Sequence, residues 1–244
     1  MMSALAPLAA ALQNPPLWLE PYLPLVRRIV HGGELSVAEK LNAAREGSGS
    51  FVSFVPHLAL PPHEAYEAFI ARTGCVPTRD NLHDLFNGLV WLTYPETKRR
   101  MNELQAEQIA LHGTSGPRGP VRDALTVFDE NAAVLQAPAE LVDALRRRDW
   151  NALFVAHRSK WQSARLIVFG HALMEKLLHP RKAITAHVWV AEALADSALA
   201  STLAPERLGA KPFLPLPLFG VPGWCPANED PAFYDDPEVF RRAR

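Results

Sequence analysis

The sequence predicts an α+β fold: a mostly helical single domain with a small antiparallel sheet and an extended C-terminal tail. Three observations predict it. Helix start and stop signals recur along the 244 residues, whereas only short runs have strand composition. Hydrophobic residues make up 48% of the chain, enough for a sizeable core. The last residues are rich in proline and aromatic side chains, a composition that ends a helix but favours burial.

The expected division of the chain has three parts. These are an N-terminal helical segment at 1–50, a core domain at 51–210, and a Pro- and aromatic-rich tail at 211–244 that packs on the core. In the first part, prolines break the chain into short helices, and Ser36 with Glu39 predicts a capping box that starts one of them. The core opens on a predicted strand, FVSFV at 51–55, whose residues are mostly β-branched or aromatic.

Helices in the first half of the core are marked by their ends. Gly74 is expected to end one helix as its C-cap. Asp80 is expected to N-cap the next helix, at 81–92, which should stop before Pro95 because a residue that precedes proline disfavours helical geometry. A long helix then runs from Pro95 to Gly113.

The second half of the core mixes helices with the strands of the sheet. Two apolar runs flank Asp129, Glu130 and Asn131 in ALTVFDENAAVLQAP, which predicts a β-hairpin with these polar residues at its tip. Helices are expected at PAELVDALRRRD and DWNALFVAHR. ARLIVFG is the clearest strand of the chain, and HALMEKLL follows it as a helix. A further helix is expected at about 187–199.

Composition excludes several classes of function. The 25 basic and 26 acidic residues nearly cancel, so no global field would draw the chain to nucleic acid or to an anionic membrane. No apolar run approaches the ~20 residues of a membrane span. The only two cysteines, Cys75 and Cys225, lie far apart in the sequence and are expected to be free thiols in a reducing cytoplasm. We therefore expect a cytoplasmic protein.

The helix expected at 81–92, NLHDLFNGLVWL, has an unusual polar face. At 100° per residue, one arc is apolar and the opposite arc holds Asp80, His83, Asp84, Asn87 and Trp91. Exposure to water is the ordinary explanation of a polar face. However, Asn, Asp and His are poor helix formers, Trp91 favours burial, and enclosed polar groups need partners. We interpret this face as a site in which His83 and Asp84 are catalytic and bind metal, and Asn87 binds substrate.

A second polar pair lies at the strand-to-helix junction in FGHALMEK. His171 and Glu175 are one helical turn apart, so they can bind one divalent metal or act as base and orienting group. A surface His–Glu pair would also explain them. We expect both residues to share one pocket and one metal with His83 and Asp84, and Glu175 to be catalytic. Asp129 joins the metal ligands if the hairpin tip leans over this pocket.

Other motifs limit the chemistry further. Arg118 and Arg122 are candidates to bind an anionic part of the substrate. The spacing of HDLFN matches a zinc-peptidase helix, but Asn87 stands where that helix needs its second histidine. The sequence also has no phosphate loop, dinucleotide fingerprint, GxSxG elbow or CxxC pair.

Four motifs in order resemble a bacterial family of unknown function. They are PTRDNLHDLFNGLVWL, RDALTVFDEN, FGHALMEK and FYDDPEVFR, and the resemblance runs from about Phe51 to Arg242. It implies a bacterial protein, and it implies no activity, substrate, cofactor or catalytic residue. The chain departs from the pattern at Ala132, where the family's hairpin loop is expected to carry glycine.

Two classes of function follow. The first is an enzyme, a metal-dependent hydrolase of a small or phosphorylated substrate, in which His, Asp and Glu hold a divalent metal and arginines bind the anion. The second is a non-catalytic domain that binds a small-molecule ligand or another protein. Metal that copurifies with converging ligands favours the first class, and an apolar groove without clustered carboxylates favours the second.

Overall fold

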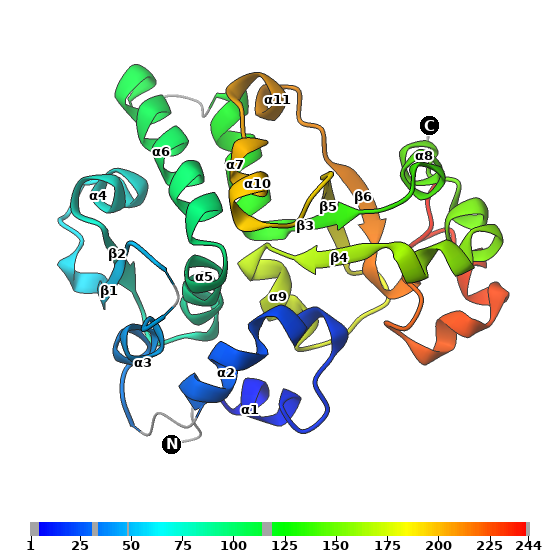
Figure 1. Cartoon of the computed structure of the whole chain (residues 1–244), viewed down its shortest axis with the longest axis horizontal. Helices are drawn as coiled ribbons and strands as arrows, with labels where there is room; N and C mark the ends of the chain where they lie inside the picture. Colours follow the sequence, from blue (N-terminus) through cyan, green and yellow to red (C-terminus); the bar gives the residue numbers. More distant parts are fainter. Residues whose placement is uncertain (1–4, 31–33, 48, 114–118, 243–244) are drawn as a thin grey trace. The chain divides into compact units, whose positions relative to one another are not determined.

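The computed structural model describes residues 5–30, 34–47, 49–113 and 119–242, and it confirms the α+β class. Within these residues, helices dominate and the strands form two small sheets (Figure 1). The chain folds into two compact units. Unit 1 comprises Met1–Pro15, Leu19–Val127 and Ala195–Lys211, and unit 2 comprises Pro16–Trp18, Phe128–Leu194 and Pro212–Arg244. These limits differ from the three parts expected from the sequence.

Unit 1 consists of helices around a two-stranded sheet. Its helices are α1 (Ala6–Ala11), α2 (Leu23–Val30), α3 (Val37–Ala44), α4 (Tyr66–Thr73), α5 (Leu82–Thr93), α6 (Pro95–His112), α10 (Asp196–Ser201), α11 (Pro205–Gly209) and the first part of α7 (Pro120–Asn131). The strand predicted from FVSFV is β1 (Ser53–Pro56), which pairs in parallel with β2 (Cys75–Thr78). Gly74 ends α4 with a φ of 66°, which confirms it as a C-cap in the left-handed region.

The start of α5 corrects one prediction. Asn81, not Asp80, is the N-cap, because its side chain accepts a 2.7 Å hydrogen bond from the Asp84 backbone N–H. Asp80 instead accepts a 2.7 Å hydrogen bond from the backbone N–H of Val37, in the first turn of α3. Two adjacent polar residues therefore serve two different helices, a division that local sequence does not reveal.

Gly88 has a packing role on α5. A Cβ atom at this position would overlap the end of the Leu41 side chain, so a larger residue would force Leu41 to move. Leu41 itself is fully buried. The poor helix former in NLHDLFNGLVWL is thus explained by helix packing inside unit 1.

Unit 2 contains a four-stranded mixed sheet in the order β4-β3-β5-β6. The strands are β3 (Ala132–Gln136), β4 (Arg165–Val168), β5 (Thr185–Val190) and β6 (Leu214–Pro217). The pairing of β3 with β5 is parallel, and the other two pairings are antiparallel. The sheet is therefore mixed, with two antiparallel pairings and one parallel pairing where an antiparallel sheet was expected. The helices of this unit include α8 (Ala139–Arg147), α9 (His171–Leu177) and a π-helix at Ala152–Ala156.

The predicted β-hairpin around Asp129 is also wrong. The segment is the end of α7, which runs directly into β3 at Ala132. Ala124, Leu125 and Phe128 are all buried, which is the spacing of one helical face. Phe128 packs edge-on against Phe169 and Trp189, with ring centroids 4.9 and 5.3 Å apart. Aromatic packing of this kind favours the helix over the local turn preference of Asp and Asn.

The helix expected at about 187–199 is replaced by β5 and α10. In β5, exposed and buried positions alternate at Thr185, Ala186, His187 and Val188, as on a sheet with one covered face. Its β-branched and aromatic residues suit a strand beside β3. The helix begins only at Asp196, in unit 1.

The C-terminal tail, from Pro212 on, is part of unit 2 and packs against its aromatic residues. It begins with β6 and continues through short 3₁₀ turns, drawn in orange to red in Figure 1. Tyr234 stacks on Phe154 at 5.1 Å, and Phe240 lies edge-on to both rings. The Arg158 guanidinium donates hydrogen bonds to the Asn228 carbonyl and to the Tyr234 hydroxyl of the tail, both 3.1 Å long.

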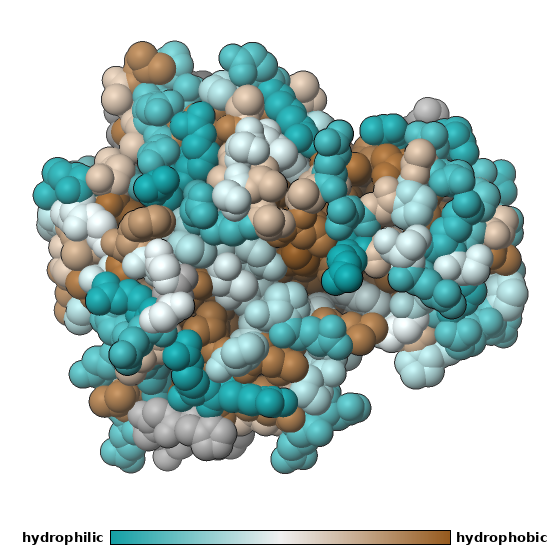
Figure 2. All heavy atoms as spheres, in the orientation of Figure 1, coloured by the Kyte–Doolittle hydropathy of each residue, from teal (hydrophilic) through white to brown (hydrophobic). Residues whose placement is uncertain are grey.

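Hydrophilic and hydrophobic residues are interspersed on the face of the molecule shown in Figure 2. Across the part of the chain that the structure describes, no helix combines the length and the apolar composition needed to cross a bilayer.

Candidate metal site

The junction of β4 and α9 places His171 beside the last turn of α7. The backbone N–H groups of Phe169 and Gly170 both donate to the Ala132 carbonyl, at 3.0 and 2.8 Å. A Cβ atom on Gly170 would lie 2.5 Å from the Glu130 carbonyl oxygen and 2.5 Å from the Asn131 nitrogen. Gly170 therefore permits a backbone approach that a larger residue would prevent. His171 is the next residue and the first of α9.

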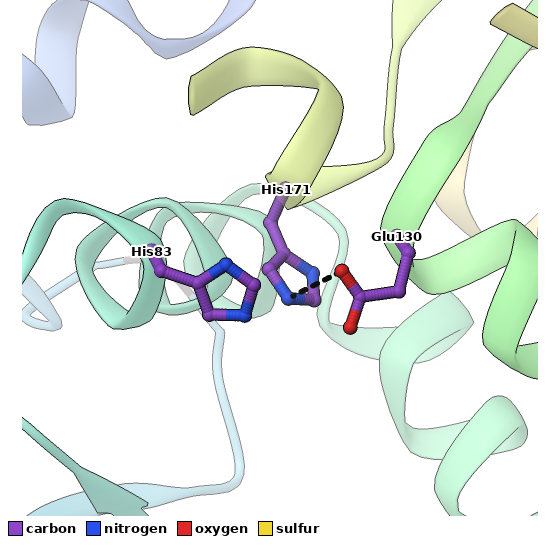
Figure 3. Close-up of side chains that lie close together, drawn as sticks. All are labelled: His83, Glu130 and His171. Carbon is purple, nitrogen blue, oxygen red and sulfur yellow. Dashed lines mark ion pairs between the residues drawn. The ribbon is translucent and has the colours of Figure 1, made fainter. Parts of the chain in front are cut away.

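Two carboxylates face the imidazole of His171 within unit 2. The Nε2 atom lies 3.6 Å from Glu130 Oε2, and the Nδ1 atom lies 3.9 Å from Asp129 Oδ1. Figure 3 shows the Glu130 side chain turned toward the His171 ring, with this ion pair as a dashed line. His171 is only 4% exposed. Both distances exceed the ~3.2 Å limit of a good N–H···O hydrogen bond.

The position of these carboxylates favours a cation beside them. Asp129 and Glu130 occupy the last turn of α7, where the helix dipole is negative and acidic side chains are unfavourable. In the same turn, the ammonium of Lys176 donates to Asn131 Oδ1 at 2.7 Å. A protonated histidine or a bound metal ion would likewise place a positive charge at this end of the helix, beside Asp129 and Glu130.

The donor groups needed for a metal are present. Glu130 and His171, drawn in Figure 3, could each supply one ligand to a metal ion within unit 2. His83 carries a further imidazole on α5 of unit 1, and its role as a ligand stays a prediction. An imidazole and a carboxylate are both ligands that zinc takes in proteins.

The carboxylate of Asp84 is bonded to Arg79, and its role as a metal ligand stays a prediction. Its carboxylate accepts hydrogen bonds from the Arg79 backbone N–H at 2.7 Å and from the Arg79 guanidinium Nε and Nη2, both at 3.1 Å. The same contacts raise the pKa of Arg79, with the side-chain hydrogen bond as the main cause. Asp84 is 7% exposed and holds the loop before α5 against the helix. These contacts explain its presence without a metal.

Asn87 belongs to a buried polar chain in unit 1. Its Oδ1 atom accepts a 2.8 Å hydrogen bond from Lys98 Nζ, and its Nδ2 atom donates to the Tyr66 hydroxyl at 3.1 Å. Lys98 also lies over the ring of Trp91, with Nζ 5.2 Å from the ring centre. On the polar face of α5, Asp84, Asn87 and Trp91 are therefore enclosed, whereas His83 is half-buried and Asp80 is exposed.

The remaining predicted residues occupy varied positions. Glu175 lies half-buried on α9, one turn beyond His171, and its role as a ligand stays a prediction. Arg122 is buried on α7, where its Nη1 atom donates to the Gly113 carbonyl at 3.4 Å. Arg118 lies outside the described residues.

Sequence reasoning missed Glu130 as a candidate ligand and Lys98 as a buried residue. Glu130 was attributed to a hairpin tip, although acidic side chains in the last turn of a helix are a signal of a nearby cation. The sequence gives little indication that Lys98 is buried, because a lysine in the first turns of a charged helix is ordinarily solvated. Its burial depends on α4 and α5, which local sequence does not show.

Comparisons with known proteins give a family and no activity. No curated protein and no solved structure matches the chain. A family model described as a protein of unknown function, DUF3025, matches residues 52–244, a span that contains the four motifs of the resemblance. The chain therefore belongs to the DUF3025 family.

Proposed function

We propose that this protein is a metal-dependent hydrolase in which Glu130 and His171 bind a divalent metal ion. The observation that carries the proposal is the arrangement of the buried His171 ring, which has one carboxylate opposite each nitrogen. His171 is nearly inaccessible to water, and a buried imidazole between two carboxylates suits a cation site better than a solvated surface pair.

The separation of the two donor atoms supports metal binding. Glu130 Oε2 and His171 Nε2 are 3.6 Å apart, which is long for a hydrogen bond. Two ligands with bonds of ~2.1 Å to one tetrahedral ion lie about 3.4 Å apart. The spacing therefore fits two ligands of a common ion with little side-chain movement.

Asp129 is suited to orient the imidazole. In metal sites, the second nitrogen of a ligating histidine usually donates to a carboxylate, which fixes the tautomer and the ring orientation. Asp129 Oδ1 lies on the Nδ1 side of His171, opposite the side that faces Glu130. We assign Asp129 this orienting role in place of a direct metal ligand.

A metal ion with an open coordination position would account for hydrolysis. Catalytic zinc sites use three protein ligands and leave the fourth position for water, whereas structural sites close all four. When bound, the metal would lower the pKa of that water and polarise the substrate. The water would add to an ester or phosphoester bond, with its hydroxyl joining the acyl or phosphoryl group and its proton passing to the leaving alcohol.

Activity assays with defined variants test this function. Protein stripped of metal and reloaded with Zn²⁺, Mn²⁺ or Mg²⁺ should hydrolyse members of a panel of carboxylic and phosphate esters, and Glu130→Gln and His171→Ala should each lower kcat at least 100-fold. The control is Glu206→Gln, which changes a carboxylate on α11 in unit 1. One metal ion bound without turnover of any ester would favour the alternative, a ligand-binding domain.

We expect this chemistry to take place in the cytoplasm. Cys75 and Cys225 are both free in the structure, as two thiols in a reducing compartment would be. The chain would then draw its metal from the cytoplasmic pool.

A further inference from the structure

Unit 2 contains a cleft between the π-helix at Ala152–Ala156 and the C-terminal tail. Its volume is about 610 Å³, within the range of ~300–1,000 Å³ that is usual for small-molecule sites. Residues of the π-helix and of the 3₁₀ helix at Arg158–Ser163 line it, together with Pro222 and Glu229 of the tail. All of these lining residues belong to unit 2. Because π-helical turns are rare and occur frequently at functional sites, this cleft is a candidate for ligand binding.

The guanidinium of Arg158 is held in a fixed orientation at the cleft. Its Nη1 atom donates to the Asn228 carbonyl and to the Tyr234 hydroxyl, both at 3.1 Å. Its Nη2 atom donates to Asn228 Oδ1 at 3.0 Å and to Glu229 Oε1 at 2.6 Å. These bonds use the four Nη hydrogens, so within the described residues Nε–H remains as the fifth donor. Glu229 likewise keeps its Oε2 atom as an acceptor.

The charges that line the cleft cancel each other. Arg158 and Glu229 form an ion pair, and the other lining residues are uncharged. Both side chains are accessible, with exposed fractions of 27% for Arg158 and 69% for Glu229. A charged ligand would meet a group of its own sign here, which is unfavourable, whereas a neutral ligand leaves the pair intact. The balance of charge therefore favours a neutral ligand.

The polar groups of the cleft offer both donors and acceptors. Ser159 and Gln162 are exposed and line it, and a serine hydroxyl or a glutamine amide can donate as well as accept. Arg158 adds a donor at Nε, and Glu229 adds an acceptor at Oε2. A ligand that matches this mixture must itself donate and accept at several positions. Hydroxyl groups do both.

An apolar surface completes the cleft, and it is provided by Val155, Trp161 and Pro222. The indole N–H of Trp161 donates to the Leu153 carbonyl at 2.9 Å, and its ring stacks on Phe154 with centroids 6.0 Å apart. Trp161 is thus fixed within unit 2, and its single donor is already used. It therefore offers a ligand apolar ring surface, against which C–H groups can pack.

We propose that this cleft binds a neutral polyhydroxylated ligand, a monosaccharide or a cyclic polyol. Its hydroxyl groups would accept from Arg158 Nε and donate to Glu229 Oε2, and Ser159 would bond a further hydroxyl. Its C–H groups would pack against Val155 and Pro222. The proposal is independent of the metal site, because it rests on other residues of unit 2 and would hold for a protein that binds no metal.

Nuclear magnetic resonance of the full chain tests the proposal. In ¹⁵N-labelled protein, each of the six tryptophans gives one indole N–H signal, and Trp161→Phe assigns that of Trp161. Gln162→Ala assigns the side-chain amide of Gln162 in the same spectra. Glucose, ribose and myo-inositol are titrated separately, with acetate and methylammonium as charged probes at constant ionic strength. We expect at least one neutral probe to shift both signals in a saturable way, without moving the signal of the fully buried Trp189.

Two variants locate the bound probe in the cleft. Glu229→Gln should weaken the neutral probe at least fivefold, because an uncharged amide forms weaker hydrogen bonds than a carboxylate. Glu238→Gln changes an exposed carboxylate of the tail that pairs with Arg241, and it should leave the affinity unchanged. If Glu229→Gln lowers the melting temperature by loosening the tail, Gln162→Ala at an exposed position keeps the test available and should also weaken the probe.

Three results would overturn the proposal. The first is the absence of a saturable shift with every neutral probe up to about 0.1 M. The second is an equal affinity in the parent protein, in Glu229→Gln and in Gln162→Ala. The third is tighter binding of acetate or methylammonium than of any neutral probe, which would make the cleft a site for a charged ligand.

Discussion

Individual residues on the polar face of α5 have different roles, and most of them are structural. Asn81 caps the helix, Asp84 binds Arg79, and Asn87 binds Lys98. His83 is half-buried on the same face, and its role as a metal ligand stays a prediction. Helix periodicity indicated that this face is unusual. It could not show which of its residues are structural, because that depends on partners up to 21 residues away in sequence, such as Tyr66.

The first prediction concerns Asp84. Asp84→Ala removes three hydrogen bonds to Arg79, of which two involve the guanidinium, and should destabilise the protein by about 1–3 kcal/mol. Denaturant unfolding measures the change. Asp143→Ala is the matched control, since it breaks an exposed ion pair with Arg146 and should stay within about 0.5 kcal/mol of the parent. Loss of bound metal in Asp84→Ala would restore Asp84 as a ligand.

Secondary-structure elements were predictable where their signals are local. The capping box of α3, the start of α6 at Pro95 and the C-cap at Gly74 were all read correctly from the sequence. The end of α7 and the strand β5 were not predicted, because the packing of Phe128 against Trp189 within unit 2 determines their structure. The same error concealed the position of Glu130, because a side chain points in a different direction at a hairpin tip than at the end of a helix.

The second prediction concerns the contact between α7 and α9. Gly170→Ala places a methyl group 2.5 Å from backbone atoms of Glu130 and Asn131, so the junction must separate. We expect metal affinity to fall at least tenfold, because His171 follows directly, and stability to fall by about 1–3 kcal/mol. Gly209→Ala is the control, since its methyl group would meet only Val121 at 4.0 Å.

Metal titration together with denaturant unfolding checks this prediction. An affinity in Gly170→Ala equal to that of Gly209→Ala would show that the close approach of the two backbones has no part in the site.

At the scale of the whole molecule, each unit is assembled from segments distant in sequence. Asp196 illustrates this within unit 1: its carboxylate accepts from the Glu96 and Thr97 backbone N–H groups, at 2.7 and 2.9 Å, and so caps α6 from about a hundred residues away. In unit 2, the tail supplies both a strand and aromatic rings to the core. Burial of the tail followed from its composition, whereas the partners of its rings did not.

The third prediction concerns the tail. Phe240 is 5% exposed and contacts the rings of Phe154, Tyr234 and Trp150, so Phe240→Ala should cost roughly 3–5 kcal/mol. Phe233→Ala is the control, because that ring is only half-buried and lies against Lys182. Calorimetry should show a clearly larger fall in melting temperature for Phe240→Ala. Equal falls for the two variants would mean that the tail is loosely held.

The central claim is that His171 is a metal ligand, and cobalt absorption spectroscopy tests it most directly. Protein freed of metal is titrated with Co²⁺, whose visible bands report the number and geometry of nitrogen and oxygen ligands. We predict saturation at one Co²⁺ per chain, loss of the bands in His171→Ala and in Glu130→Gln, and no change in His179→Ala, which removes an exposed histidine just beyond α9. An identical cobalt spectrum in His171→Ala and the parent protein would contradict the account.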